Sequence, residues 1–301
     1  MAADTDEPVA AFIIEDEPEP HLTPEEVHTL LGFVQEFQPI IVGGQAINIW
    51  AELYHGTDAE LDALGELTSK DLDFYHNRDA EHALAKSLED GLLLIPKGDD
   101  HTPNAAVVTG KLGDRDIVVD FLAQIKGVED SSLLKNSITF ADAEKPESIS
   151  ITLMHPLDCV RSRLSNINML GRRNEHSVRQ AIASIMILDC FINHQLGDGG
   201  DQDGSRRAFD AICDLEAIIQ SKHIGKVTEL EFGDQLDPTA ILRKYRYDER
   251  LDQRIRDHQI QGIIDRLDRK REISEKRRAD AAERAACTTD VDRRAFRPEF
   301  S

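Results

Sequence analysis

The sequence lacks long apolar runs, a secretory leader and paired cysteines. No segment approaches the ~20 consecutive apolar residues of a membrane-spanning helix, and the first residues lack a basic stretch followed by an apolar one. The four cysteines, Cys159, Cys190, Cys213 and Cys287, show no C-x-x-C spacing, which argues against disulfides and a zinc site. We therefore expect core thiols in a reducing compartment, and a cytoplasmic protein that does not contact a membrane.

Basic residues are also scarce. The chain has 35 Lys and Arg against 57 Asp and Glu, a net charge of −22. Such a balance repels polyanions and argues against extended binding to a phosphate backbone, so any nucleic-acid contact has to be local. The end of an RNA could bind if the basic segment from Arg161 to Arg173 lines the substrate cleft. With 301 residues, of which 40% are hydrophobic, the chain is long enough to bury a core and belongs to the globular class.

The composition changes twice along the chain. Residues 1–20 carry acids, three prolines and no base, which is typical of a solvated tail. Residues 21–150 alternate strand-like and helix-like segments and predict an α/β domain, whereas 151–301 read as a helical domain with a long charged C-terminal helix. We expect strands at 39–42, 71–75, 105–112 and 115–125, and helices at 24–37, 45–54, 78–91, 155–170, 175–196, 204–224 and 237–286.

Two carboxylates stand one residue apart in "SKDLDFY", residues 69–75. In a strand, Asp71 and Asp73 share one face while Leu72 and Phe74 point into a core. Like charges at this spacing repel unless one is protonated or a cation lies between them. Asp120, which ends "IVVD", is the candidate third carboxylate, and Asp116 on the same face is the alternative.

Three segments together resemble a known superfamily. "IIVGGQAINIWAELY", "TSKDLDF" and "IVVDFL" are similar to the signature segments of DNA-polymerase-beta-type nucleotidyltransferases, and most of all to the AbiEii-type group of toxins. The resemblance spans roughly residues 39–122. It implies an α+β fold, in which a mixed sheet with flanking helices is followed by a helical domain.

The resemblance also implies an activity: transfer of an NMP group from an NTP to a hydroxyl acceptor, which could be tRNA, a protein side chain or a small molecule. A toxin or defence role, with an antitoxin as protein partner, comes with it. Divalent metal ions serve such chemistry because they neutralise phosphate charge, so Mg²⁺ is the expected cofactor, with Mn²⁺ as the alternative. The implied metal-binding and catalytic residues are Asp71, Asp73 and Asp120, and the implied nucleotide-binding residues are Gly43, Gly44, Ser69 and Arg163.

The chain departs from the family pattern in three ways. Arg163 stands where the family usually has a lysine, so it can bind phosphate but cannot act as a base; Arg172 and Arg173 could assist it. "RRNEHSVRQA" contains no clean counterpart of a later Arg-Asp-x-x-Asp segment. Gly44 and Asp71 are also 27 positions apart, a longer gap than usual.

Other interpretations stay open. Gly43 and Gly44 could form only a tight turn, and the aspartates could line the solvated edge of a strand. A haloacid-dehalogenase-type phosphatase needs Thr or Val where this chain has Tyr75, and a D-x-D glycosyltransferase has no use for the upstream Gly-Gly strand. The main rival is an inactive nucleotidyltransferase scaffold that binds a partner protein.

Overall fold

The computed structural model describes residues 21–65, 67, 71–97, 100, 102–141, 148–197, 202–221, 224 and 237–295, with only the backbone described at 202–203 and 285–295. The expected acidic tail, 1–20, lies outside the described residues. The same holds for Ser69, one of the candidate nucleotide-binding residues, and for its neighbour Lys70.

In the described part of the chain, seven strands form one sheet in the order β3-β4-β5-β2-β1-β7-β6. The β2–β5 and β1–β7 pairs are parallel, and the other neighbours are antiparallel. The chain is therefore an α+β protein with a mixed sheet, as expected. The strands are β1 (Ile40–Val42), β2 (Leu72–Tyr75), β3 (Glu89–Leu94), β4 (Asn104–Leu112), β5 (Arg115–Leu122), β6 (Ile138–Phe140) and β7 (Ile151–Leu153).

The first two helices begin at signals that the sequence carries. Helix α1 (Pro24–Val34) follows Thr23, whose side chain accepts the backbone N–H of Glu26 while the Glu26 carboxylate accepts that of Thr23. This capping box satisfies two backbone donors that the helix leaves free. Helix α2 (Gly43–Leu53) follows β1 directly, and it includes the two glycines that we expected to form a separate turn.

The β2–β5 pair places apolar and acidic residues on opposite faces. Leu72, Phe74 and Phe121 are fully buried, and the two phenylalanine rings stack with centroids 5.3 Å apart. Because side chains alternate along a strand, Asp73 and Asp120 point to the other face. The expected burial pattern of "LDF" is confirmed.

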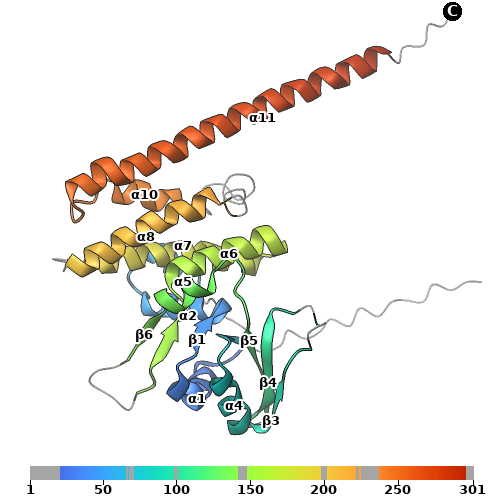
Figure 1. Cartoon of the computed structure of the whole chain (residues 1–301), viewed down its shortest axis with the longest axis vertical. Coiled ribbons are helices and arrows are strands. Elements are labelled where there is room, and N and C mark those ends of the chain that lie inside the picture. Colours follow the sequence, from blue (N-terminus) through green and yellow to red (C-terminus); the bar gives the residue numbers. More distant parts are fainter. Residues whose placement is uncertain are drawn as a thin grey trace, which may run out of the picture.

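The helices lie in layers on the sheet. Figure 1 shows α6 (Pro156–Leu170), α7 (Glu175–Leu196) and α8 (Gln202–Gln220) stacked above it, with α11 (Gln261–Ala295) beyond them. Helix α2 packs against α6 and α7. Helices α6, α7 and α8, which were expected at 155–170, 175–196 and 204–224, are confirmed within a few residues.

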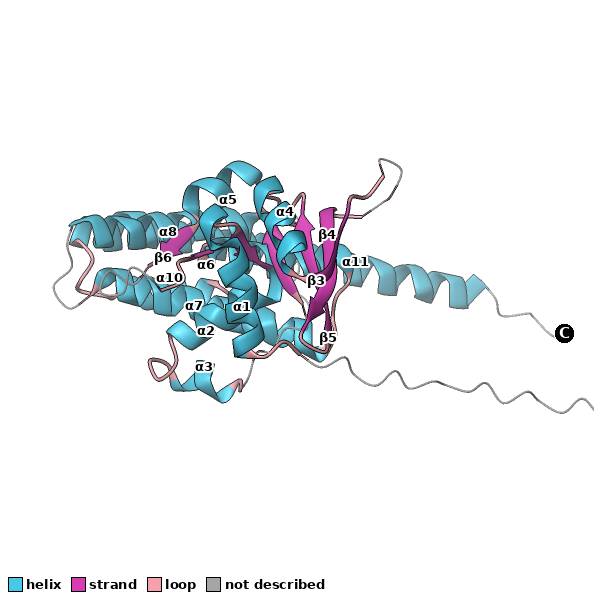
Figure 2. Cartoon of the chain, turned by 90° about the horizontal axis from the view of Figure 1, so that it is seen from below, coloured by secondary structure: helices cyan, strands magenta, loops and turns pink. Residues whose placement is uncertain are grey.

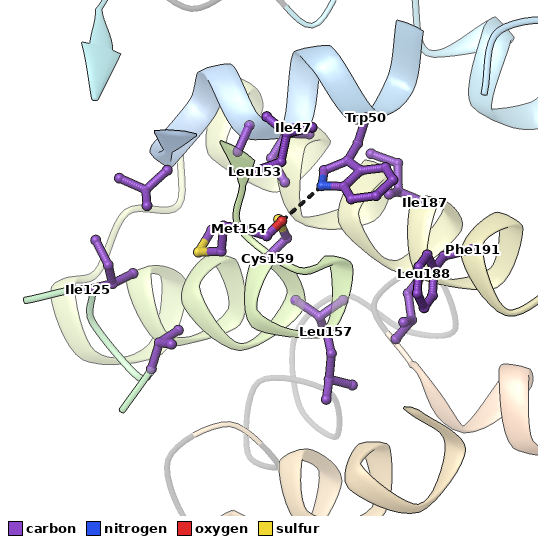
Figure 3. Close-up of a cluster of buried hydrophobic side chains, with 14 of the residues drawn as sticks. Ile47, Trp50, Ile125, Leu153, Met154, Leu157, Cys159, Ile187, Leu188 and Phe191 are labelled. Atoms are coloured by element: carbon purple, nitrogen blue, oxygen red, sulfur yellow. Dashed lines mark hydrogen bonds between the residues drawn. The ribbon is translucent and has the colours of Figure 1, made fainter. Parts of the chain in front are cut away.

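Trp50 joins the sheet layer to the helical layer. Its indole N–H donates to the backbone carbonyl of Met154, at 2.9 Å, and its ring meets Phe191 edge-on in a cluster with Cys159 and Leu188 (Figure 3). One continuous hydrophobic core extends through both halves of the chain. The core packing is continuous across residue 150, and the expected division into two domains there stays a prediction.

The helix expected at 78–91 is too long. Helix α4 (Arg78–Ser87) ends earlier, and residues 89–94 form the edge strand β3 instead. Gly91 does not cap the helix: a Cβ there would lie 1.9 Å from the carbonyl oxygen of Ala85, so only glycine lets the strand return over the helix end. Pairing with β4 thus overrides the helical pattern of "SLED".

Four short elements were not expected: α3 (Ala59–Ala63), α5 (Asp130–Asn136), β6 and β7. Each is too short to show periodicity. Strand β7 forms because it pairs with β1, which is distant in the sequence, and with β6. Its strand conformation therefore depends on contacts that exist only in the folded chain.

The single helix expected at 237–286 is also wrong. The chain forms α10 (Thr239–Tyr245), a turn, a π-helical segment (Ile255–Ile260) and then α11. Asp248 closes the turn by accepting the backbone N–H and guanidinium of Arg250, and Leu251 is buried beside it. Helix α11 packs through its first turns and extends beyond the body (Figure 2). Among the described helices, none is long and apolar enough to cross a membrane.

The Trp50–Met154 hydrogen bond generates a stability prediction. Trp50→Phe removes the donor and leaves the buried carbonyl oxygen of Met154 without it, so the free energy of unfolding should fall by about 1–3 kcal/mol. Urea denaturation measures this loss. Leu53→Ala on the same helix, at a side chain 47% exposed, should change stability by only about 0.5 kcal/mol; equal effects in both variants would contradict the role of Trp50.

Candidate functional site

Asp73 and Asp120 lie side by side on neighbouring strands. They are register partners in the parallel β2–β5 pair, so their Cα atoms are separated by about 4.8 Å, the spacing between strands. Asp71 precedes the first residue of β2 and is exposed. The structure thus brings the three carboxylates predicted from sequence to one edge of one cleft.

The carboxylates repel one another. Burial, the charge of Asp120 and the charge of Asp71 raise the pKa of Asp73 to about 7, against the lowering effect of Arg163 and Arg172. Burial and the charge of Asp71 raise the pKa of Asp120, while a hydrogen bond from Asn104 opposes them. A cation placed among these groups would relieve the repulsion.

Gly43 lets Asp73 approach the start of helix α2. Its φ is +69°, and a Cβ at this position would lie 2.0 Å from the Asp73 carboxylate oxygen and 2.9 Å from its carboxyl carbon. Only glycine accommodates both the left-handed backbone and the close contact. Gly44 follows within the helix, and both glycines line the cleft. Free backbone N–H groups at a helix start favour anions.

The opposite wall of the cleft, which has a volume of about 1510 Å³, comes from α6 and α7. Arg163 donates from one guanidinium nitrogen to the side-chain oxygen of Gln180, at 2.8 Å, whereas its buried Nε has no hydrogen-bond partner among the described residues. Burial lowers the pKa of Arg163, and the charges of Cys159 and Asp73 oppose this. A buried cation with an unused donor faces the carboxylates.

Three candidates from the sequence lie elsewhere. Asp116 shares a face with Asp120 but is four residues away along β5, about 13 Å, and it does not line the cleft. Arg161, part of the basic segment that an RNA end would require in the cleft, pairs instead with the fully buried Asp158 at 3.0 Å and faces a smaller pocket of about 400 Å³. Arg173 is not part of the cleft lining, but Arg172 is.

Sequence reasoning missed several cleft residues. Asn104 donates to the Asp120 carboxylate at 3.0 Å, and no local pattern identifies it because the contact depends on β4–β5 pairing. Gln180 is 2% exposed and precedes Leu188 by eight residues, on the apolar stripe of α7; a polar residue at a core position was a usable signal. His176 also lines the cleft, and burial together with Arg179 and Arg163 lowers its pKa.

The three carboxylates fit a hard divalent cation in their ligand type, since Mg²⁺ takes a few carboxylates and keeps other positions for water and phosphate. The placement of Asp73 and Asp120 on adjacent strands and the raised pKa values of these two carboxyl groups agree with this fit. Among the described residues, however, no three His, Cys, Asp or Glu side chains are grouped closely enough to form a ready-made metal site.

Comparison of the chain with protein-family models, with curated proteins and with solved structures gives no match.

The raised pKa of Asp73 predicts a pH dependence of stability. The folded pKa of about 7 lies above the ordinary value of 3.8, so the folded state binds this proton more tightly than the unfolded state does. Without divalent metal, the stability of the wild type relative to Asp73→Asn should therefore fall as the pH rises from about 4 to about 7 and then level off. Chemical denaturation of both proteins in a chelator at five pH values measures this difference; a difference that does not vary with pH would contradict the assignment.

Gly43→Ala should destabilise the protein more than a positive φ alone explains. Gly56 provides the matched control, because its φ is +77° and nothing lies within 4 Å of its Cβ position. Gly56→Ala should cost about 1 kcal/mol, whereas Gly43→Ala should cost at least about 1 kcal/mol more, since the methyl group displaces Asp73. Thermal and urea unfolding compare the two, and equal losses would show that Asp73 yields freely.

Proposed function

We propose that the chain is a metal-dependent nucleotidyltransferase that moves an NMP group from an NTP to a hydroxyl acceptor. One observation carries the proposal: Asp73 and Asp120 are register partners at the edge of a cleft, directly beside the glycine start of α2. Repelling carboxylates next to the N-terminus of a helix suit a metal-bound triphosphate. The resemblance to nucleotidyltransferases of the AbiEii type supports the same reading.

The triphosphate would bind between the two walls of the cleft. Gly43 and Gly44 would let it approach the backbone N–H groups of α2, and Arg163 would donate its unpaired Nε–H and add positive charge. Gln180 holds the guanidinium in place. Because arginine stays protonated, its role is charge stabilisation and not proton transfer.

Asp71, Asp73 and Asp120 would hold Mg²⁺, or Mn²⁺ in its place, which when bound neutralises charge on the phosphates and activates the incoming hydroxyl. Asp120 is positioned by the amide of Asn104, so its carboxylate would be held in place to receive the hydroxyl proton of the acceptor. Burial on the β2–β5 pair keeps Asp73 beside it.

A toxin or defence role, with an antitoxin as partner, follows from the resemblance alone. Acceptors remain a protein side chain, a small molecule or the end of a tRNA. The charges of the cleft weigh against long RNA, because Arg161 is engaged with Asp158 and leaves Arg163 and Arg172 as the arginines of the cleft lining.

A catalytically inactive scaffold is the second candidate. It is favoured by the absence of a ready-made metal group among the described residues, and by α11, whose side chains from 268 to 284 are mostly exposed and highly charged. On this reading the cleft is a remnant and the long helix binds a partner protein.

Ligand-dependent stability separates the two candidates. Mg²⁺ with an NTP should raise the melting temperature of the wild type, because a ligand that binds only the folded state stabilises it by mass action. The shift should be lost in Asp73→Asn and Asp120→Asn. Thermal unfolding with each of the four NTPs measures it, and label transfer from α-labelled NTPs into a cell extract tests turnover.

Asp116→Asn is the matched control, since Asp116 lies on the same strand and face as Asp120 but outside the cleft. It should keep the thermal shift with Mg²⁺ and NTP, because it lies outside the cleft. Equal loss in Asp116→Asn and Asp120→Asn, or a wild type that responds to no NTP, would exclude the proposed site.

A further inference from the structure

An exposed apolar surface lies next to the cleft. Among the described residues, ten large hydrophobic side chains are exposed, and three of them share the open face of strands β3 and β5: Leu92 at 60%, Leu94 at 52% and Val118 at 50%. Helix α4 packs on β3 and β4, where it covers the opposite face that carries Val108 and Val119. We call the open face, made of Leu92, Leu94, Val107, Thr109 and Val118, the β3–β5 shelf.

The shelf continues into the carboxylate site. Strand register aligns Leu94 with Val107, Val107 with Asp120, and Asp120 with Asp73. Directly paired residues lie on the same face of a sheet, so one row runs from the apolar edge strand to both aspartates. Neighbouring strands are about 4.8 Å apart, which places Leu94 about 10 Å from Asp120. A molecule resting on the shelf would therefore reach the site.

The charges around the shelf restrict what can bind it. On the open face of β3–β5, Lys111 is the only base in these fully described strands, and its register partners are Asp116 and Glu89. For its phosphates, nucleic acid would find only Lys111 on this described face, and two carboxylates flank that lysine. A second copy of the chain would bring another net charge of −22, which opposes self-association.

An apolar floor with an acidic rim is complementary to a basic protein segment. The rim carries Glu89, Asp90 and Asp116, all exposed, and these would pair with Lys or Arg. The floor would take the apolar side chains between them. A hydroxyl side chain in such a segment could extend past Val107 to Asp120.

Resting on the proposed function, we infer that the acceptor is a protein, and that its acceptor segment, apolar with Lys or Arg at its flanks, docks on the β3–β5 shelf. A Ser, Thr or Tyr oxygen of that segment forms a bond to the α-phosphorus of the NTP. The bond from that phosphorus to the bridging oxygen breaks, and pyrophosphate leaves. The hydroxyl proton passes to the Asp120 carboxylate and then to water.

Docking is tested without catalysis by a paired substitution. Leu92→Ser with Val118→Ser changes two exposed side chains outside the proposed machinery, and Ile273→Ser, at 48% exposure on α11, is the control. Fluorescence anisotropy of the full chain uses three probes: a Lys-flanked peptide of Leu, Val and Ser residues, the same peptide with Glu flanks, and a single-stranded RNA. The Lys-flanked peptide should bind the wild type and Ile273→Ser equally, and the double variant at least about tenfold more weakly.

If the peptide bound only by non-specific attraction to an acidic protein, the double variant would bind it as tightly as the wild type does. That result would overturn the inference. Preferred binding of the RNA would overturn it too. Sedimentation is run in parallel, because a wild-type dimer that becomes a monomer in the double variant would show that the shelf binds a second copy instead.

Label transfer then separates this inference from the proposed function. With α-labelled NTPs, Mg²⁺ and a cell extract, the wild type should transfer label to material that protease degrades and RNase does not. The double variant should transfer at least about tenfold less label, while its thermal shift with NTP stays the same. RNase-sensitive label, or undiminished labelling by the double variant, would overturn the protein acceptor alone. No label in any fraction would instead overturn the proposed function and the acceptor with it.

Discussion

The pairing of β2 with β5 is the constraint on which the rest of the structure depends. One face of this pair is a stacked contact between Phe74 and Phe121 in the core, and the other holds Asp73 beside Asp120. Burial of the aromatic rings fixes the register, because a slip by one residue would move every side chain to the opposite face. The hydrophobic contact thus holds two like charges together that would otherwise separate.

The elements around this pair accommodate its charge. Gly43 has no side chain to obstruct Asp73, Asn104 donates to Asp120, and Arg163 faces the carboxylates from the helical layer. Trp50 ties α2 to the segment that leads into α6, so the backbone beside the glycines and the wall with Arg163 belong to one rigid core. Such preorganisation is what an electrostatic site requires.

Two surfaces therefore meet at Asp120. On one side lies the polar cleft, with arginines suited to phosphate. On the other lies the apolar β3–β5 shelf, which has almost no positive charge. The proposed reaction uses two substrates of different chemistry, a triphosphate and an apolar protein segment. The cationic wall of the cleft would bind the first, and the apolar face of the sheet would bind the second.

The sequence by itself determined the elements with strong local signals: the capped α1, the β1–α2 unit, the burial of "LDF" and the three long helices α6, α7 and α8. The resemblance of three segments to nucleotidyltransferases also implied that Asp71, Asp73, Asp120, Gly43 and Gly44 lie together, and all five line one cleft. Only the tertiary structure decided that residues 89–94 form a strand, that Asn104 and Gln180 belong to the site, and that Arg161 does not. Those contacts join residues far apart or compete with local propensity, and long-range pairing, which decides them, leaves no mark in a local pattern.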